Sequence, residues 1–242
     1  SLGGFRPDLH GPHLTLRLQR ISRQRPMVGP SPSLPTLPGC GVDEKQRLRG
    51  AMRLSRRKPV ESLPVATRAL LFLRPPTPLA ALAGEGSTVG LYHANPYEAP
   101  TRGYARWFFE NGRHVALPRF AARGDRMDFR AWRDPYDDSD LELGPYGHLQ
   151  PAAEAEPVRP AIVIVPLLAF TAAGARLGQG GGHYDRWLAD HPDVTAVGIG
   201  WDSQLVDELP LEPHDRLLRA VVTPTRNPVN IPGPIPTATA ET

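Results

Sequence analysis

The residues best suited to chemistry are concentrated between Gly174 and Asp185, where glycines surround Arg176. The glycines stand at positions 174, 178, 180, 181 and 182. Closely spaced glycines let backbone N–H groups converge without interference from Cβ atoms, and such a nest binds anions. A helix beginning at His183 would add unpaired N–H groups and the positive end of its dipole, and Arg176 would add a full charge. The segment therefore predicts a binding site for phosphate groups.

Two familiar phosphate-binding patterns are missing from this segment. A Walker A loop ends in Gly-Lys-Ser/Thr, which does not follow here. The dinucleotide fingerprint, counted from Gly178, requires a glycine at position 183, where the chain has histidine. On the residues alone, a mobile turn with no ligand stays open as a second interpretation.

The glycines follow an apolar run at residues 161–165, AIVIV, which is typical of a strand buried on both faces. Further strands are predicted at 87–92, 114–118, 127–132, 194–200 and 219–223, the third of them at a sheet edge because apolar and polar residues alternate. Helices are predicted at 43–58, with Asp43 as N-cap, at 64–73, at 101–111 and from 183 onward.

This alternation of strands and helices predicts an α/β fold, in the form of a single three-layer domain with a largely parallel sheet flanked by helices. Open sheets of this kind bind ligands outside the carboxyl ends of their strands. The strand at 161–165 delivers the glycines to such a position.

Both ends of the chain differ in composition from the middle. Residues 1–41 are rich in Pro, Arg and Ser without the apolar period of a helix or strand, and the last residues are also Pro-rich. Such segments cannot bury enough apolar surface to offset the entropy lost on ordering. We therefore predict disordered arms at 1–41 and 225–242 around one domain at 42–224.

Charge is distributed unevenly along the chain. Residues 1–60 hold 12 Lys and Arg against 3 Asp and Glu, whereas residues 61–242 hold 16 against 22. A basic arm before an acidic body is one way to contact nucleic acid or an anionic membrane, but no aromatic interleaving or nucleic-acid motif accompanies it. We prefer the interpretation that the basic helix serves a site in the domain, without a nucleic-acid partner.

The remaining composition indicates a soluble protein, with 22% charged and 40% hydrophobic residues among 242. No apolar run approaches the ~18 residues that a membrane span needs, so no membrane partner is expected. The single cysteine, Cys40, excludes internal disulfides and suits a reducing compartment. We predict a cytoplasmic monomer.

The glycine-rich segment also resembles a known signature, that of the 5-formyltetrahydrofolate cyclo-ligase (methenyltetrahydrofolate synthetase) family. The matching positions are Pro166, Phe170, Gly174, Arg176, Leu177, Gly178, Gly180, Gly182, Tyr184 and Asp185. Supporting resemblances follow in the family's order, at KQRLRGAMRLSRR (45–57), LYHANPYEAPT (91–101), GPYGHLQP (144–151) and GIGWDSQLVDELPLEPHDRLLRAVVT (198–223). The chain departs from the family pattern at Thr171 for Asp, Gln150 for Glu, His183 for Tyr, and Gln179 for a residue that is often aromatic or basic.

The resemblance implies an ATP-dependent ligase that closes 5-formyltetrahydrofolate to 5,10-methenyltetrahydrofolate and releases ADP and phosphate, with Mg²⁺ as cofactor. It implies catalytic roles for Arg176, Lys45 and Arg49. ATP would contact Lys45, Arg49, Arg176, Leu177, Gly178, Gln179, Gly180, Gly181, Gly182, His183 and Tyr184. The folate would contact Glu98, His93, Gln179, Gly180, Gly181, Gly182, His183 and Tyr184.

Asp185 and Asp215 are the implied Mg²⁺ ligands, since Mg²⁺ favours carboxylates together with water and phosphate oxygens. On the residues alone, Asp185 is equally suited to a helix N-terminus, Asp215 to capping a turn, and Glu98 to a solvated loop. Two other functions also stay open. One is a different small-molecule phosphotransferase, and the other is a nucleotide- or folate-binding protein with altered or lost turnover.

Overall fold

The computed structural model describes residues 41–225, with side chains from residue 44 onward. The arms predicted at 1–41 and 225–242 therefore lie almost wholly outside the described residues. None of the described helices is long and apolar enough to cross a lipid bilayer.

The elements in chain order are α1 (Gly41–Glu61), α2 (Val65–Leu71), α3 (Thr77–Leu82), β1 (Thr88–Gly90), α4 (Arg102–Glu110), β2 (His114–Arg119), β3 (Asp128–Ala131), β4 (Leu141–Leu143), β5 (Leu149–Pro151), β6 (Ile162–Pro166), β7 (Ala169–Phe170), β8 (Arg176–Leu177), α5 (His183–Asp190), β9 (Thr195–Ile199), the short 3-10 helix η1 (Asp202–Gln204) and β10 (Ala220–Val222).

A six-stranded sheet forms the centre, with its strands in the order β10-β9-β6-β1-β2-β3. All neighbouring strands are parallel except β2 and β3, which are antiparallel. The prediction of a largely parallel sheet with residues 127–132 at its edge is confirmed. The AIVIV run forms most of β6, an inner strand whose Ile162–Val165 are all buried, as an apolar run without alternation requires.

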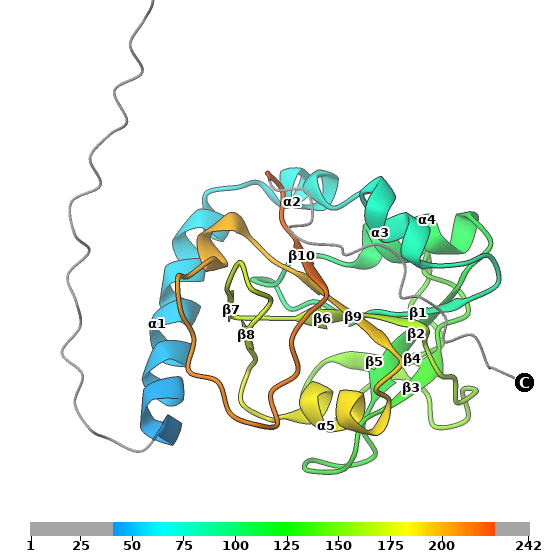
Figure 1. Cartoon of the computed structure of the whole chain (residues 1–242). Coiled ribbons are helices and arrows are strands. Elements are labelled where there is room, and N and C mark those ends of the chain that lie inside the picture. The colour runs from blue at the N-terminus through cyan, green and yellow to red at the C-terminus, as the bar shows by residue number, and fades with distance from the viewer. Residues whose placement is uncertain (1–40, 226–242) are drawn as a thin grey trace, which may run out of the picture. The chain divides into compact units, whose positions relative to one another are not determined.

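Helices cover both faces of this sheet (Figure 1). Successive residues of a strand point to opposite faces. Ile164 accordingly packs in the cluster that contains Phe108 of α4, whereas Val163 packs in the cluster that contains Trp187 of α5. Helices α2, α3 and α4 lie over one face and α5 lies over the other, which gives the predicted flanked sheet.

The connections change direction beside β1. Strand β1 leads through α4 to β2 on one side, and the chain later returns to β6 on the other side of β1. A switch point of this kind leaves a crevice outside the carboxyl ends of the strands. Helix α1 stands beside that end of the sheet, where Met52 packs with Leu168 and Leu177.

The structure differs from the sequence prediction between β6 and α5. Instead of one flexible loop, the segment begins with a hairpin in which Ala169 pairs with Leu177 and Phe170 pairs with Arg176. The loop proper is Gly178–Gly182. The predicted N-cap is also wrong, because Asp43 lies inside α1.

Gly174, in the turn of the β7–β8 hairpin, provides a test of how tightly the hairpin is fixed. Its φ is +88°, and a Cβ atom built there would lie 2.5 Å from the Leu218 carbonyl oxygen. Gly174→Ala should therefore lower the free energy of unfolding by on the order of 2–3 kcal/mol, measured by urea denaturation.

Gly86 supplies the matched control, because its φ is +70° but nothing lies within 4 Å of an added Cβ. Gly86→Ala should cost only about 1 kcal/mol, the strain of the left-handed backbone alone. Equal losses of unfolding free energy in the two variants would show that the backbone at Leu218 moves away from the added Cβ at no measurable cost.

Candidate active site

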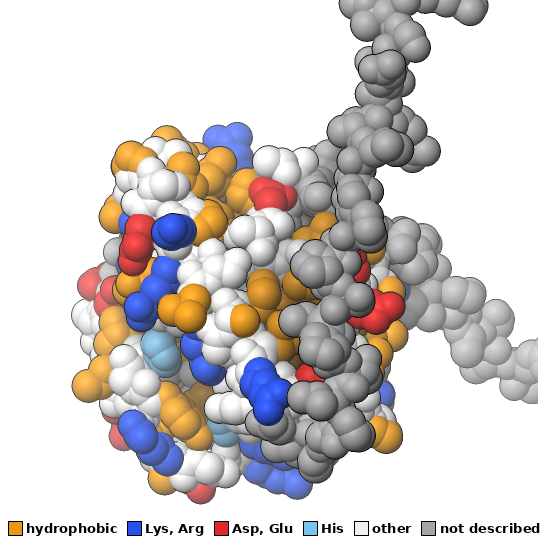
Figure 2. Space-filling view, turned by 90° about the vertical axis from the view of Figure 1, so that its left-hand side faces the viewer, with side chains coloured by type: hydrophobic (Ala, Val, Ile, Leu, Met, Phe, Trp, Pro, Cys, Tyr) orange, Lys and Arg blue, Asp and Glu red, His pale blue; other side chains and the backbone are white. Residues whose placement is uncertain are grey.

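A cavity of about 500 Å³ opens at the carboxyl ends of β1, β2 and β6, at the switch point of the sheet. Its walls come from α1, from the segments that follow these strands, from the glycine loop and from residues 212–215. The side of the molecule that carries α1 is turned to the viewer in Figure 2, where Lys, Arg and His side chains lie among uncharged surface. The lining residues are Lys45, Arg49, Tyr92, His93, Glu98, Pro118, Phe120, Gly144, Tyr146, His148, Leu149, Gln150, Pro166, Arg176, Leu177, Gly178, Gln179, Gly180, Gly181, Gly182, His183, Tyr184, Asp185, Glu212, His214 and Asp215.

The glycine loop forms one wall and runs into the N-terminus of α5. Gly180 has φ +109° and Gly182, the N-cap residue of α5, has φ +61°, conformations that favour glycine. Helix α1 holds the loop from outside. The Arg49 Nε donates to the Gly178 carbonyl oxygen at 3.2 Å, and Arg53 donates to the Gln179 carbonyl oxygen at 3.1 Å. Helix α1 therefore contacts the loop at two consecutive carbonyl groups.

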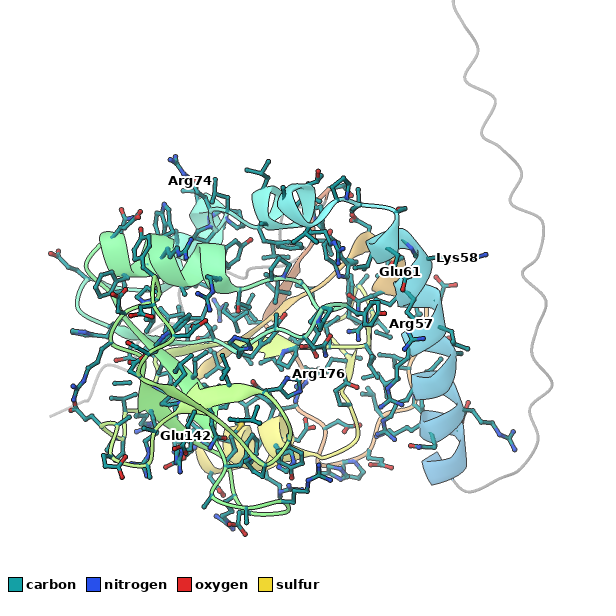
Figure 3. All side chains as sticks on the ribbon, turned by 180° about the vertical axis from the view of Figure 1, so that it is seen from behind. Arg57, Lys58, Glu61, Arg74, Glu142 and Arg176 are labelled. Atoms are coloured by element: carbon teal, nitrogen blue, oxygen red, sulfur yellow. The ribbon has the colours of Figure 1, made fainter. Side chains whose placement is uncertain are left out.

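Arg176 reaches the cavity from β8. Its Nη2 donates to Asp185 Oδ1 at 2.6 Å and its Nη1 donates to the Arg216 carbonyl oxygen at 2.7 Å. The guanidinium is buried, with 4% of the side chain exposed. Figure 3 shows Arg176 in the interior, between the strands and α1, whereas Lys58 of α1 points to solvent. Two partners thus hold the cation in one orientation.

Asp185 forms its hydrogen bonds with groups outside the helix that carries it. Although Asp185 lies in the first turn of α5, the helix has no side-chain cap. Besides Arg176, its Oδ1 accepts a hydrogen bond from the Arg216 N–H at 3.3 Å. The carboxylate therefore connects the glycine loop to the chain that follows Asp215.

Lys45 forms a second pair of opposite charges at the cavity wall. Its Nζ lies 2.8 Å from Asp215 Oδ2 and 3.0 Å from Glu212 Oε2. Burial acts to lower the pKa of Lys45, but the hydrogen bonds to both carboxylates outweigh it and hold that pKa above its ordinary value. Burial likewise acts to raise the pKa of Asp215, and the Lys45 ammonium reverses this shift. Both groups are therefore charged at neutral pH.

Asp215 also closes the turn in which it lies, as one interpretation of the sequence expected. Its Oδ2 accepts from the Glu212 N–H at 2.8 Å, and its own N–H donates to the Glu212 carbonyl oxygen at 3.0 Å. One carboxylate thus both shapes the 212–215 turn and faces the cavity.

The carboxylates suit a hard divalent cation. Ligand atoms of Glu212, His214 and Asp215 lie within 4.8 Å of one another. Asp185 is outside that group but lines the same cavity. Oxygen donors beside a loop that can bind phosphate are those that Mg²⁺ prefers, so the residues present fit this cation.

Glu98 lies in another part of the cavity lining and is buried, not solvated, with 9% of the residue exposed. Its Oε2 accepts from the Asn95 N–H at 3.0 Å, and its Oε1 accepts from Gln179 Nε2 at 3.3 Å. His93 also lines this region, and burial lowers its pKa. A buried carboxylate in a cavity is well placed to accept hydrogen bonds from a ligand that presents N–H donors.

An aromatic corner, made by Phe120, Tyr146 and His183, forms a further wall. The Phe120 ring centroid lies 4.7 Å from that of His183 and 4.9 Å from that of Tyr146, both in edge-to-face geometry. The Gln150 side chain fixes Phe120 by donating to its carbonyl oxygen at 3.0 Å and accepting from its N–H at 3.1 Å. An ionised Glu cannot donate, so Gln150 performs here a role that the family's usual residue would not.

The other departures from the family pattern also have structural partners. Thr171 accepts the Ala175 N–H at 3.2 Å in the hairpin turn and is not among the cavity residues. Gln179 joins Arg53 of α1 to Glu98. The departures thus leave the glycines, Arg176 and Asp185 in place, whereas Gln150 and Gln179 are neutral where the family has Glu and an often aromatic or basic residue.

Apart from Gly174, which lies in the turn of the β7–β8 hairpin, every residue that the sequence singled out for the site lines this one cavity. The sequence analysis did not assign Tyr92, Phe120, Tyr146, Glu212 or His214 to the site. Phe120 lies two residues after the strand predicted at 114–118, which is a signal for a ligand-binding position. Glu212 and His214 are close to Asp215 in the sequence, whereas Tyr146 lies in the segment at 144–151 that resembles the family but was given no role.

Comparisons with known proteins agree on one family. A sequence model of the 5-formyltetrahydrofolate cyclo-ligase family matches residues 42–224. The chain is 49% identical over 67 residues to the 5-formyltetrahydrofolate cyclo-ligase of Escherichia coli strain K12, which covers 27% of this chain and 37% of that protein. It is 46% identical over 67 residues to the one from Mycolicibacterium smegmatis, covering 27% of this chain and 34% of that protein. The aligned segments thus span little more than a third of these relatives.

Solved structures show the same fold. The 5,10-methenyltetrahydrofolate synthetase of Aquifex aeolicus superposes with a TM-score of 0.60 at 23% identity, over 81% of this chain and 97% of that one. The synthetase of Mycoplasma pneumoniae superposes with a TM-score of 0.54 at 18% identity, over 74% and 97% of the two chains.

Proposed function

The chain belongs to the 5-formyltetrahydrofolate cyclo-ligase family, and we propose that it closes 5-formyltetrahydrofolate to 5,10-methenyltetrahydrofolate at the expense of ATP, releasing ADP and phosphate. One observation carries the proposal. A single cavity brings the cations Lys45, Arg49 and Arg176 together with the glycine loop, and has the buried carboxylate of Glu98 in its lining. Such a cavity offers one region for a triphosphate and another for a ligand rich in N–H donors.

The reaction needs charge neutralisation and alignment more than a protein nucleophile. A formamide oxygen is a poor leaving group, and transfer of the γ-phosphoryl group of ATP to it creates a good one. N10 of the folate then attacks the activated formyl carbon, and phosphate leaves. The site must hold both substrates in line and stabilise the charge on the transferring group.

The phosphate region is formed by the glycine loop and the cations around it. Arg176 is fixed in advance by Asp185 and the Arg216 carbonyl oxygen, so little reorganisation is needed when charge develops. Lys45 and Arg49 bring further positive charge from α1. The backbone N–H groups of residues 178–184 complete the set that we assign to ATP.

Asp185 and Asp215 are the residues that we propose to hold Mg²⁺. When bound, this cation neutralises phosphate charge and orients the triphosphate. Without ligands, each carboxylate is paired with one of the proposed phosphate-binding cations, Asp185 with Arg176 and Asp215 with Lys45. When magnesium and triphosphate bind together, Asp185 and Asp215 would hold the cation while Arg176 and Lys45 would contact phosphate oxygens, an exchange of partners that would leave no charge in the cavity uncompensated.

The folate region is assigned to Glu98, His93 and the loop residues from Gln179 to Tyr184. Glu98 accepts hydrogen bonds from the amino and ring N–H groups of the pterin. His183 borders the ligand within the aromatic corner. The cavity is formed within one chain, which supports a monomer, and we place the protein in the cytoplasm on the basis of its composition.

A direct assay tests the proposal. Purified protein mixed with 5-formyltetrahydrofolate and MgATP should produce the absorbance of the methenyl product together with equimolar ADP. Turnover of ATP with another acceptor, but not with the folate, would indicate a different phosphotransferase. Binding of both ligands by calorimetry without product would indicate a binding protein that has lost turnover.

A further inference from the structure

Arg56 lies on the face of α1 that is turned into the molecule. One turn earlier on the same face, Arg53 contacts Gln179, and one turn later Val60 is wholly buried in the main core. Arg56, between them, is also buried, with 4% of its surface exposed. Its neighbour Arg57 is exposed and lies over the Tyr97 ring at 5.1 Å.

The Arg56 guanidinium is not satisfied by its surroundings. Its Nε and Nη1 are buried and have no hydrogen-bond partner among the described residues. A buried charged group without partners destabilises a fold by several kcal/mol, and arginine does not escape by losing its proton. Arg176, buried to a similar degree, has two partners. The charge of Arg56 therefore does not stabilise the fold.

Glu98 is the carboxylate that acts most strongly on this charge. Burial lowers the pKa of Arg56, and Glu98 is the main influence opposing that shift. Gln179, held by Arg53 on one side, donates to Glu98 on the other, so this face of α1 adjoins the Glu98 wall of the cavity. Glu98 itself makes no ion pair with any residue in the described part of the chain. Its hydrogen bonds come from neutral N–H groups, of Asn95 and Gln179.

We propose that Arg56 is a positioning residue of the folate region, a buried counter-charge for Glu98 while this carboxylate accepts hydrogen bonds from the pterin N–H donors. This inference rests on the proposed function. In the free protein, Glu98 is buried in the wall of the cavity and accepts hydrogen bonds from neutral N–H groups. When the ligand covers this wall, the positive charge of Arg56 offsets part of the cost of holding the carboxylate away from water.

The test uses Arg56→Met, which keeps much of the side-chain length and removes the charge. The Kd for 5-formyltetrahydrofolate, measured by calorimetry without ATP, should rise at least about tenfold, whereas kcat at saturating folate should change less than about threefold. The Tm of the unliganded variant should be equal to or higher than that of the wild type, because an unpartnered buried charge has been removed. Arg56→Lys should restore most of the affinity.

Two controls separate this role from a structural one. Arg57→Met removes the adjacent, exposed arginine and should leave the Kd unchanged. In a Glu98→Gln background, Arg56→Met should cause less than about a twofold further loss, since no anion remains to be balanced.

Three results would each overturn the inference. They are an unchanged Kd for the folate in Arg56→Met, effects of Arg56→Met and Glu98→Gln on the Kd that add in the double variant, and a marked fall in the Tm of Arg56→Met. A variant that fails to fold contradicts it in the same way, because it would show that Arg56 stabilises the protein. If the wild type does not bind the folate at all, the proposed function fails, and this inference fails with it. If the wild type binds and Arg56→Met binds equally well, only the inference fails.

Discussion

Replacing Arg176 by alanine should lower kcat by about 10²–10³, with a much smaller effect on the Kd for the folate. Arg176 is a fully charged donor, buried in the cavity wall and oriented by two partners before any ligand arrives. Donors fixed in this way act mainly on charge that develops during the reaction, so their loss appears in kcat. Single-turnover measurements of methenyl formation at saturating substrates provide the test.

Loss of Arg176 also leaves Asp185 without its main partner, so stability must be followed in the same variant. Arg176→Lys keeps the charge but loses the two-pronged contact, and we expect it to recover only part of the rate. Arg126→Ala is the matched control, because Arg126 is paired with Asp190 at 3.0 Å on the surface, with 86% of its side chain exposed. That variant should retain wild-type kcat and stability within about 1 kcal/mol. A normally folded Arg176→Ala protein with unchanged kcat would show that Arg176 only supports the loop.

The sheet could be predicted from the sequence because its strands carry strong local signals. Residues 161–165 are apolar without interruption and form an inner strand. Residues 127–132 alternate between apolar and polar side chains and form the edge strand. The glycines after an inner strand likewise marked the phosphate region. Each of these features is a property of a few consecutive residues.

The rest depends on contacts that no short stretch of sequence reveals. The β7–β8 hairpin has two-residue strands, too short to show a period, and it is held by packing against α1. The aromatic corner joins residues from three separate segments, and Phe120 is fixed by Gln150 from a fourth. Arg56 looks in the sequence like any basic residue of a basic helix, and only its burial distinguishes it from Arg57.

Asp215→Asn should change the binding of metal-free and magnesium-bound ATP in opposite directions. In the free protein, Asp215 and Glu212 neutralise Lys45, so a bare triphosphate must compete with them for the ammonium. Removing the Asp215 charge leaves Lys45 more available, and calorimetry in the presence of EDTA should show tighter binding of ATP. The same change removes a negative charge from the set proposed for Mg²⁺, so the magnesium concentration for half-maximal turnover should rise by at least about tenfold.

Asparagine is chosen because its amide oxygen can still accept the Glu212 N–H, which preserves the turn at 212–215. The Tm should therefore fall only slightly. Glu212→Gln is the comparison, since Glu212 also contacts Lys45 but is more exposed, with 35% of its side chain accessible against 16% for Asp215. We expect it to tighten metal-free ATP binding by less and to raise the magnesium concentration for half-maximal turnover by less than Asp215→Asn does. If Asp215→Asn weakens both forms of ATP equally, Asp215 serves the turn alone, and the exchange of partners between the two charge pairs does not occur.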